Sequence, residues 1–180
     1  MSDVLVRLAT LLREEGGLMA TLVGSEPPSD PARDPGLSSP ARVAAEGPRT
    51  EGRREEYELL VEAIYEGYLV HYGVPRVVRP AEADIGLLAG DQLYAIGLAM
   101  LVGLGDTAAV AELADTITLS ALAHGAGEQA LADAVWDAGA RAVGWGSSDA
   151  HRRAKDLAFA GAPGAIEAMR TSAAGLSESP

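Results

Sequence analysis

Apolar residues recur at helical spacing along most of the chain. Over residues 3–23 they fall three or four positions apart, with charged residues on the opposite side, which predicts an amphipathic helix. The Gly16-Gly17 pair is expected to divide that helix into two short pieces. The same period predicts helices at 54–72, 82–104, 107–124, 126–143, 149–160 and 163–174. Because no segment shows the alternation of a strand, the fold class predicted is all-α, a helical bundle.

Prolines gather between the first helix and the rest of the chain. Six of the ten prolines lie in residues 24–53, together with Ser, Gly and charged residues. Such a composition supplies little for a core, and we expect a disordered, Pro-rich flexible linker. The predicted organisation is an N-terminal amphipathic helix (1–23), this linker (24–53), a helical domain (54–174) and a tail (175–180).

The segment at 82–104 is apolar almost all round, which predicts the central, buried helix of the bundle. Its uninterrupted apolar run, residues 93–105, is shorter than the roughly 20 residues of a membrane span, so we expect a core helix and no transmembrane segment. Gly86, Gly90 and Gly97 lie near one face of this helix. Because each glycine costs about 1 kcal/mol relative to alanine, close packing of a neighbouring helix is the simplest explanation, and a ligand groove is the alternative.

The chain is acidic, with a formal net charge of −12. No Lys or Arg lies between Arg79 and Arg141, whereas nine acidic residues do. This argues against nucleic acid and anionic membranes as partners, and a diphosphate could bind there only through a cation such as Mg²⁺ or with basic residues from elsewhere. The absence of cysteine excludes thiol catalysis and Cys-based zinc sites. The N-terminus does not have the pattern of a signal peptide, so a cytoplasmic location is expected.

Asp91 is the candidate residue for chemistry, since it lies with Gln92 in an otherwise apolar helix. A buried carboxylate must be paired or bound to a ligand. Exposure, or pairing with Arg76, Arg79 or a tyrosine, is the simpler explanation, and a pocket that uses Asp91 is the alternative.

The remaining polar residues do not complete a catalytic or metal-binding motif. The three histidines lack metal-binding spacing, and His71 and His124 are expected to interact with the dipoles at helix ends. The acidic pairs Asp133/Asp137 and Glu112/Asp115 are expected to form solvated helix faces. No nucleotide-binding or nucleophile motif is present.

One segment resembles a known family. The residues HYG at 71–73 and LLAGDQLYAIGLAML at 87–101 resemble the middle of all-trans prenyl diphosphate synthases, where a histidine and a glycine precede a glycine-rich helix with a Gly-Asp pair. The resemblance covers roughly residues 60–135. The chain lacks the DDxxD clusters that hold Mg²⁺ in those enzymes. It is therefore most similar to a small, non-catalytic subunit such as component I of heptaprenyl diphosphate synthase.

The resemblance implies an isoprenoid-synthase-like bundle without catalytic residues, metal ligands or a cofactor of its own. It implies a catalytic polyprenyl diphosphate synthase, or another isoprenoid-pathway protein, as the partner. The candidate residues for ligand binding or interaction are His71, Gly86, Gly90, Asp91, Gln92 and Tyr94. Two alternatives remain open. One is an isoprenoid- or lipid-binding protein or enzyme that uses Asp91, and the other is a structural module that homo-oligomerises through its small residues.

Overall fold

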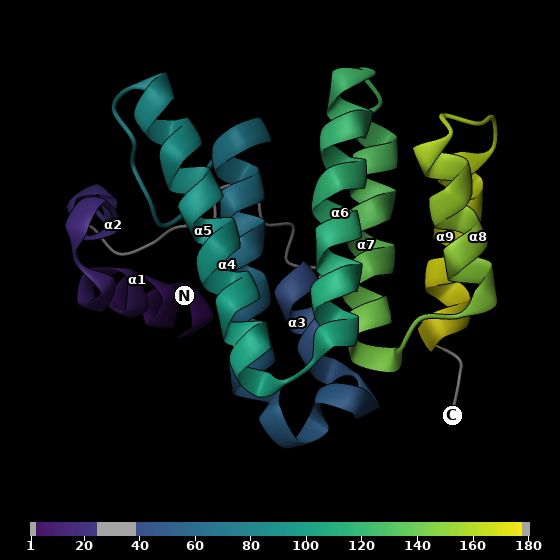
Figure 1. Ribbon diagram of the computed structural model, residues 1–180, viewed down its shortest axis with the longest axis horizontal. Helices are drawn as coiled ribbons and strands as arrows, with labels where there is room; N and C mark the ends of the chain where they lie inside the picture. The colour runs from purple at the N-terminus through teal and green to yellow at the C-terminus, as the bar shows by residue number, and fades with distance from the viewer. Residues whose placement is uncertain (1–2, 25–38, 178–180) are drawn as a thin grey trace.

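The computed structural model describes residues 3–24 and 39–177, and this part of the chain is all-α (Figure 1). Three helical hairpins stand side by side, formed by α4 with α5, α6 with α7, and α8 with α9. The α-helices are α1 (Asp3–Glu15), α2 (Gly17–Leu22), α3 (Pro40–Glu46), α4 (Arg54–Tyr72), α5 (Ala83–Leu104), α6 (Thr107–Gly125), α7 (Gln129–Trp145), α8 (Asp149–Phe159) and α9 (Ala165–Ser177), and a 3-10 helix, η1, covers Pro48–Arg53.

All six helices predicted between residues 54 and 174 are present. Their ends follow capping residues: the Asp106 carboxylate accepts the Ala109 N–H at 3.0 Å to begin α6, and Ser148 accepts the N–H of His151 to begin α8. Pro163, which the sequence places in the first turn of the last helix, lies instead in the turn before α9. Gly164 follows it with a φ of 84°, a conformation that suits a turn and delays the start of the helix.

The N-terminal segment forms two helices, as predicted, and they pack on their own chain. Gly16 has a φ of 75°, which ends α1 and lets α2 turn away. The apolar stripe of α1 is buried in one cluster with residues of α4, α5 and the loop between them, among them Ala63, Val78 and Leu93. The N-terminal helix is therefore an integral part of the core.

The prediction of a flexible linker is wrong for residues 39–53, which form α3 and η1, and residues 25–38 lie outside the described part. Pro40 and Pro48 each occupy a first turn. Backbone N–H groups there have no acceptor within the helix, so the missing N–H of proline costs no hydrogen bond. Small apolar residues between the prolines are buried against α4 and α7: Ala41, Val43, Ala44 and Ala45. Proline content alone does not distinguish such a sequence from a linker.

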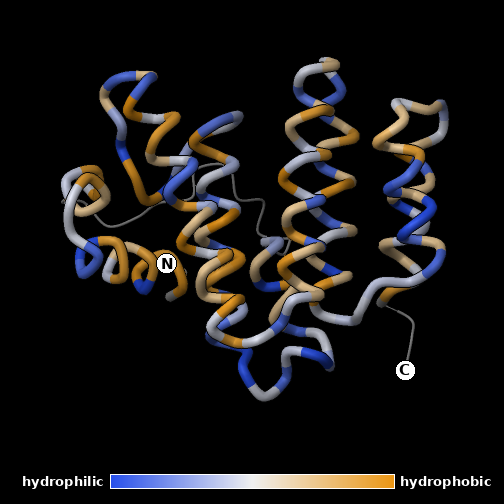
Figure 2. The backbone as a smooth tube through the Cα atoms, in the orientation of Figure 1, coloured by the Kyte–Doolittle hydropathy of each residue, from blue (hydrophilic) through white to orange (hydrophobic). Residues whose placement is uncertain are grey.

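The central helices are α4 and α7, and the prediction that 82–104 is the central helix is wrong. Three large side chains of α5 are well exposed: Leu87 at 55 %, Leu88 at 58 % and Val102 at 67 %. By contrast, α4 packs against α1, α3 and α5 and buries even Glu62 and Glu66. Figure 2 shows hydrophobic colouring along much of α5, which stands in front of α4 in this view. An apolar helix is thus covered by its own chain on part of its surface only.

Candidate functional site

The glycines of α5 face α4 and allow the two helices to approach closely. A Cβ on Gly90 would lie 2.4 Å from His71 Nε2, and one on Gly97 would lie 2.3 Å from Ile64 Cγ1. A Cβ on Gly86 would make an ordinary contact, 3.6 Å from Pro80. The close-packing explanation is confirmed for Gly90 and Gly97, and it means that this small-residue face is already covered within the chain.

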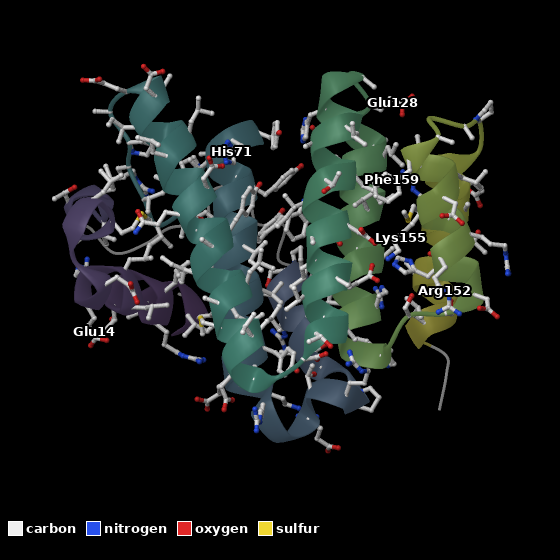
Figure 3. The ribbon with its side chains drawn as sticks, in the orientation of Figure 1. Glu14, His71, Glu128, Arg152, Lys155 and Phe159 are labelled. Carbon is white, nitrogen blue, oxygen red and sulfur yellow. The ribbon has the colours of Figure 1, made fainter. Side chains whose placement is uncertain are left out.

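His71 and Asp91, which the sequence singles out separately, lie together where α4 ends beside α5 (Figure 3 labels His71). Their Nε2 and Oδ1 atoms are 3.3 Å apart but do not form a hydrogen bond. The imidazole is nearly buried, whereas the Asp91 side chain is 75 % exposed. Asp91 is therefore a surface anion, and its charge does not require a ligand in a buried pocket.

Tyr94 and Gln92 complete the surroundings of this corner. The Tyr94 ring stacks on His71 with centroids 5.4 Å apart. Burial raises the pKa of the Tyr94 hydroxyl, and the nearby Tyr72 and Asp91 raise it further, so the phenol stays neutral. Gln92 is half-buried. At this corner one exposed carboxylate lies beside the stacked rings of His71 and Tyr94. The corner contains no nucleophile that a neighbouring base activates.

An aromatic cluster joins α4 to the α6–α7 hairpin. The Tyr68 hydroxyl lies 2.9 Å from His124 Nε2, and Tyr72 stacks on the same imidazole with centroids 4.3 Å apart and planes 2° apart. Tyr65 and Tyr68 also contact Trp136. His124 therefore holds two hairpins together in addition to lying at the end of α6, and the tyrosines of α4 serve as packing residues.

A buried polar cluster that the sequence did not reveal joins α6, α8 and α9. His151 Nε2 lies 2.7 Å from Glu112 Oε1 and Nδ1 lies 3.2 Å from Ser172 Oγ, while the Lys155 ammonium donates to Glu112 at 2.9 Å and to Asp115 at 2.8 Å. Burial alone would raise the pKa of Glu112, but the bonds from His151 and Lys155 outweigh it and lower the pKa. The expectation of a solvated face is wrong for Glu112.

A second buried ionic cluster fixes the loop between α4 and α5. Arg76 forms ion pairs with Glu62 and Glu66, all three nearly inaccessible to solvent. Glu66 Oε1 also accepts the backbone N–H groups of residues 76–78. Because Arg76 is committed to these two glutamates, it is not the partner of Asp91.

The other acidic pair, Asp133 and Asp137, has partners within its own helix. Asp137 pairs with Arg141 at 3.1 Å, and Asp133 accepts a hydrogen bond from the Gln129 amide. Both aspartates are exposed, as predicted. Within residues 3–24 and 39–177, no group of three or more His, Asp or Glu side chains could hold a metal ion.

The most unusual surface is the outward side of α5 and α6, which we term the α5–α6 face. In the view of Figure 1, α5 lies over α4 and α6 lies over α7, so these outward sides belong to one side of the molecule. The face comprises exposed apolar or small residues: Leu87, Leu88, Ala95, Ala99 and Val102 from α5, and Ala108, Ala111, Ala114, Thr118 and Leu122 from α6. Asp84 and Asp91 are the exposed charged residues on the α5 part. It spans about 27 Å from Asp84 to Val102 at 1.5 Å per residue.

By length and composition α5 could cross a membrane, and among the described helices it alone meets that test. Core helices of soluble proteins meet the same test. The side of α5 that packs on α4 is already covered.

Comparison with known proteins gave no match to a family model, a curated protein or a solved structure. The assignment of function therefore depends on the surface just described and on the sequence resemblance.

Proposed function

We propose that this chain is a non-catalytic helical subunit that binds a polyprenyl diphosphate synthase, or another protein of an isoprenoid pathway, through the α5–α6 face. The observation that carries the proposal is the exposure of Leu87, Leu88 and Val102 on a helix whose other side is packed. Burying one such side chain contributes about 1.5–3 kcal/mol, so a partner that covers three of them gains substantial binding energy.

The nature of the partner is taken from the resemblance of residues 60–135, which correspond to most of α4, to α5 and α6, and to the first turns of α7. The isoprenoid-synthase-like character of the bundle belongs to this same proposal. No Lys or Arg lies between Arg79 and Arg141, and no metal-binding cluster occurs in the described part of the chain. This segment therefore has neither the basic side chains nor the bound metal ions that usually bind a diphosphate. These features favour a supporting subunit over a self-sufficient enzyme.

The two alternative functions gain less from the geometry. Asp91 is exposed, which weakens the argument for a buried ligand pocket around it. The glycine side of α5 is covered by α4, so that side is not free for a homo-oligomer, which could use the α5–α6 face instead. A homo-oligomer would give a larger mass for the chain alone, and the light-scattering experiment described next measures that mass.

The test is co-expression with the polyprenyl diphosphate synthase of the same organism, followed by size-exclusion chromatography with light scattering. We expect a complex with the wild-type chain and none with Val102→Lys, because the substitution places a charge in the apolar face. The matched control is Leu157→Lys, an exposed apolar position on α8, which should leave the complex intact. The proposal fails if the synthase does not bind, or if Val102→Lys binds as tightly as the control.

A further inference from the structure

The charges on the α5–α6 face restrict what can cover it. Asp84 and Asp91 are seven residues apart, so they lie two helical turns apart on one side of α5. Asp91 is 75 % exposed, and the exposed neighbours on its side of the helix are apolar or small. A partner that buries this side must therefore desolvate carboxylates, which is costly unless it supplies opposite charge.

A second copy of this chain that pairs through the same face does not supply that charge. The stripe from Asp84 to Val102 has its midpoint at residue 93, so in a two-fold antiparallel pairing Asp91 lies beside residue 95 of the copy. The two copies of Asp91 are then about 6 Å apart along the helix axis, with the axes about 8–10 Å apart. Because no Lys or Arg occurs between Arg79 and Arg141, like charges meet at the centre of the interface without a Lys or Arg from α5 or α6 of either copy.

We infer that the α5–α6 face binds a helix of a different protein, one with an apolar stripe bordered by Lys or Arg side chains that meet Asp84 and Asp91. The acidic pair serves as the element that rejects self-pairing, while the leucines and valine supply the apolar contact. This inference rests on the proposed function, since it specifies the chemistry of the partner for the same face. An anionic membrane surface is disfavoured by the same two carboxylates.

The probes are two synthetic helical peptides of about 18 residues, long enough to cover the stripe. They share one Leu/Ala stripe and differ at two bordering positions seven apart, which are Lys in one peptide and Glu in the other. Fluorescence anisotropy should show the Lys peptide binding the full chain at least about tenfold more tightly, with a difference that shrinks at high salt. Asp91→Lys should abolish the preference, since Asp84 then faces the peptide together with a lysine, and Asp156→Lys, a change of an exposed aspartate on α8, should keep it.

The outcomes separate this inference from the proposed function. Equal binding of both peptides, binding of neither, or a preference that survives Asp91→Lys would overturn the inference. A homodimer of the wild-type chain that Val102→Lys dissociates would also overturn it. If the synthase does not bind but the peptide preference holds, the identity of the partner is wrong and the charge selectivity stands. If the synthase binds but the peptides are not distinguished, the function stands and the selectivity is wrong.

Discussion

The contact between Gly47 and Gly144 gives the sharpest test of whether residues 39–53 belong to the core. Gly47 ends α3 with φ −74° and ψ 157°, a conformation open to any residue, so alanine there costs nothing in local backbone strain. However, a Cβ at position 47 would lie 2.2 Å from the backbone carbonyl carbon of Gly144 in α7. Since the obstacle is backbone, a change of side-chain rotamer cannot relieve it.

The expected magnitude follows from two opposing terms. Overpacking a core costs about 1–3 kcal/mol, and a clash with backbone belongs at the upper end of that range. Reduced freedom of the unfolded chain returns about 0.4–1 kcal/mol when glycine becomes alanine. We therefore expect Gly47→Ala to lower the free energy of unfolding by about 2 kcal/mol, which corresponds to a fall in melting temperature of about 4–8 °C for a chain of this size.

The matched control is Gly52→Ala in η1, where nothing lies within 4 Å of the added Cβ. This variant should be unchanged or up to about 1 kcal/mol more stable. Both variants are measured by urea denaturation followed by circular dichroism and by differential scanning calorimetry. If Gly47→Ala and Gly52→Ala unfold alike, residues 39–53 do not pack against α7 and the interpretation of this region is refuted.

Three further predictions concern the buried polar groups. Glu112→Gln should reduce the free energy of unfolding at neutral pH by about 3 kcal/mol, since it breaks a buried ion cluster. Because the pKa of Glu112 is lowered from 4.5, its contribution is complete above that pH and is lost as the pH falls through the lower folded-state pKa, so urea midpoints of wild type and variant should converge in acid. Tyr57→Phe should cost about 1.5 kcal/mol by removing the hydrogen bond to Asp106. Burial and Asp106 raise the pKa of Tyr57 to about 12, so its contribution to the free energy of unfolding is complete below pH 10 and is lost as the pH rises through 12. If the Phe variant loses as much stability at alkaline pH as the wild type does, the loss does not come from Tyr57. Arg76→Met should cost at least about 3 kcal/mol by leaving Glu66 buried without its ion pair, and a calorimetric melting temperature within 2 °C of wild type would show that the cluster is not coupled to folding.

The helices of residues 54–174 could be predicted because their apolar period is long and their ends carry strong local signals. Asp106 begins α6 through a bond to a backbone N–H only three residues away, so the sequence contains all that the end requires. The short helix α3 carries a start signal, since Ser39 caps it and Pro40 lies in its first turn, but that signal alone does not predict a helix. The helix has only seven residues, and it is stabilised by α4 and α7, whose arrangement the local sequence does not contain.

The polar clusters could be predicted only in part for the same reason. His151 and Lys155 are four apart and Glu112 and Asp115 are three apart, so each pair is expected to share a helix face. Whether the two faces meet depends on how α8 folds back on α6, which is a tertiary property. The pattern of opposite charges at matching spacing on two predicted helices was the available signal. Asp91, in contrast, is visible as unusual in the sequence itself, because it is a charged residue within an apolar helix.

The position of α5 shows why an all-round apolar pattern has two physical explanations. Such a helix is either enclosed by its own chain or covered partly by its own chain and partly by another. The two sides of α5 distinguish these cases, since glycines line the side where α4 approaches and leucines, a valine and two aspartates line the side that is left exposed. Small residues serve where a backbone must come close, whereas large apolar residues on an uncovered side stabilise nothing within the monomer. The distribution of residue size around α5 therefore supports the proposal that a partner covers its second side.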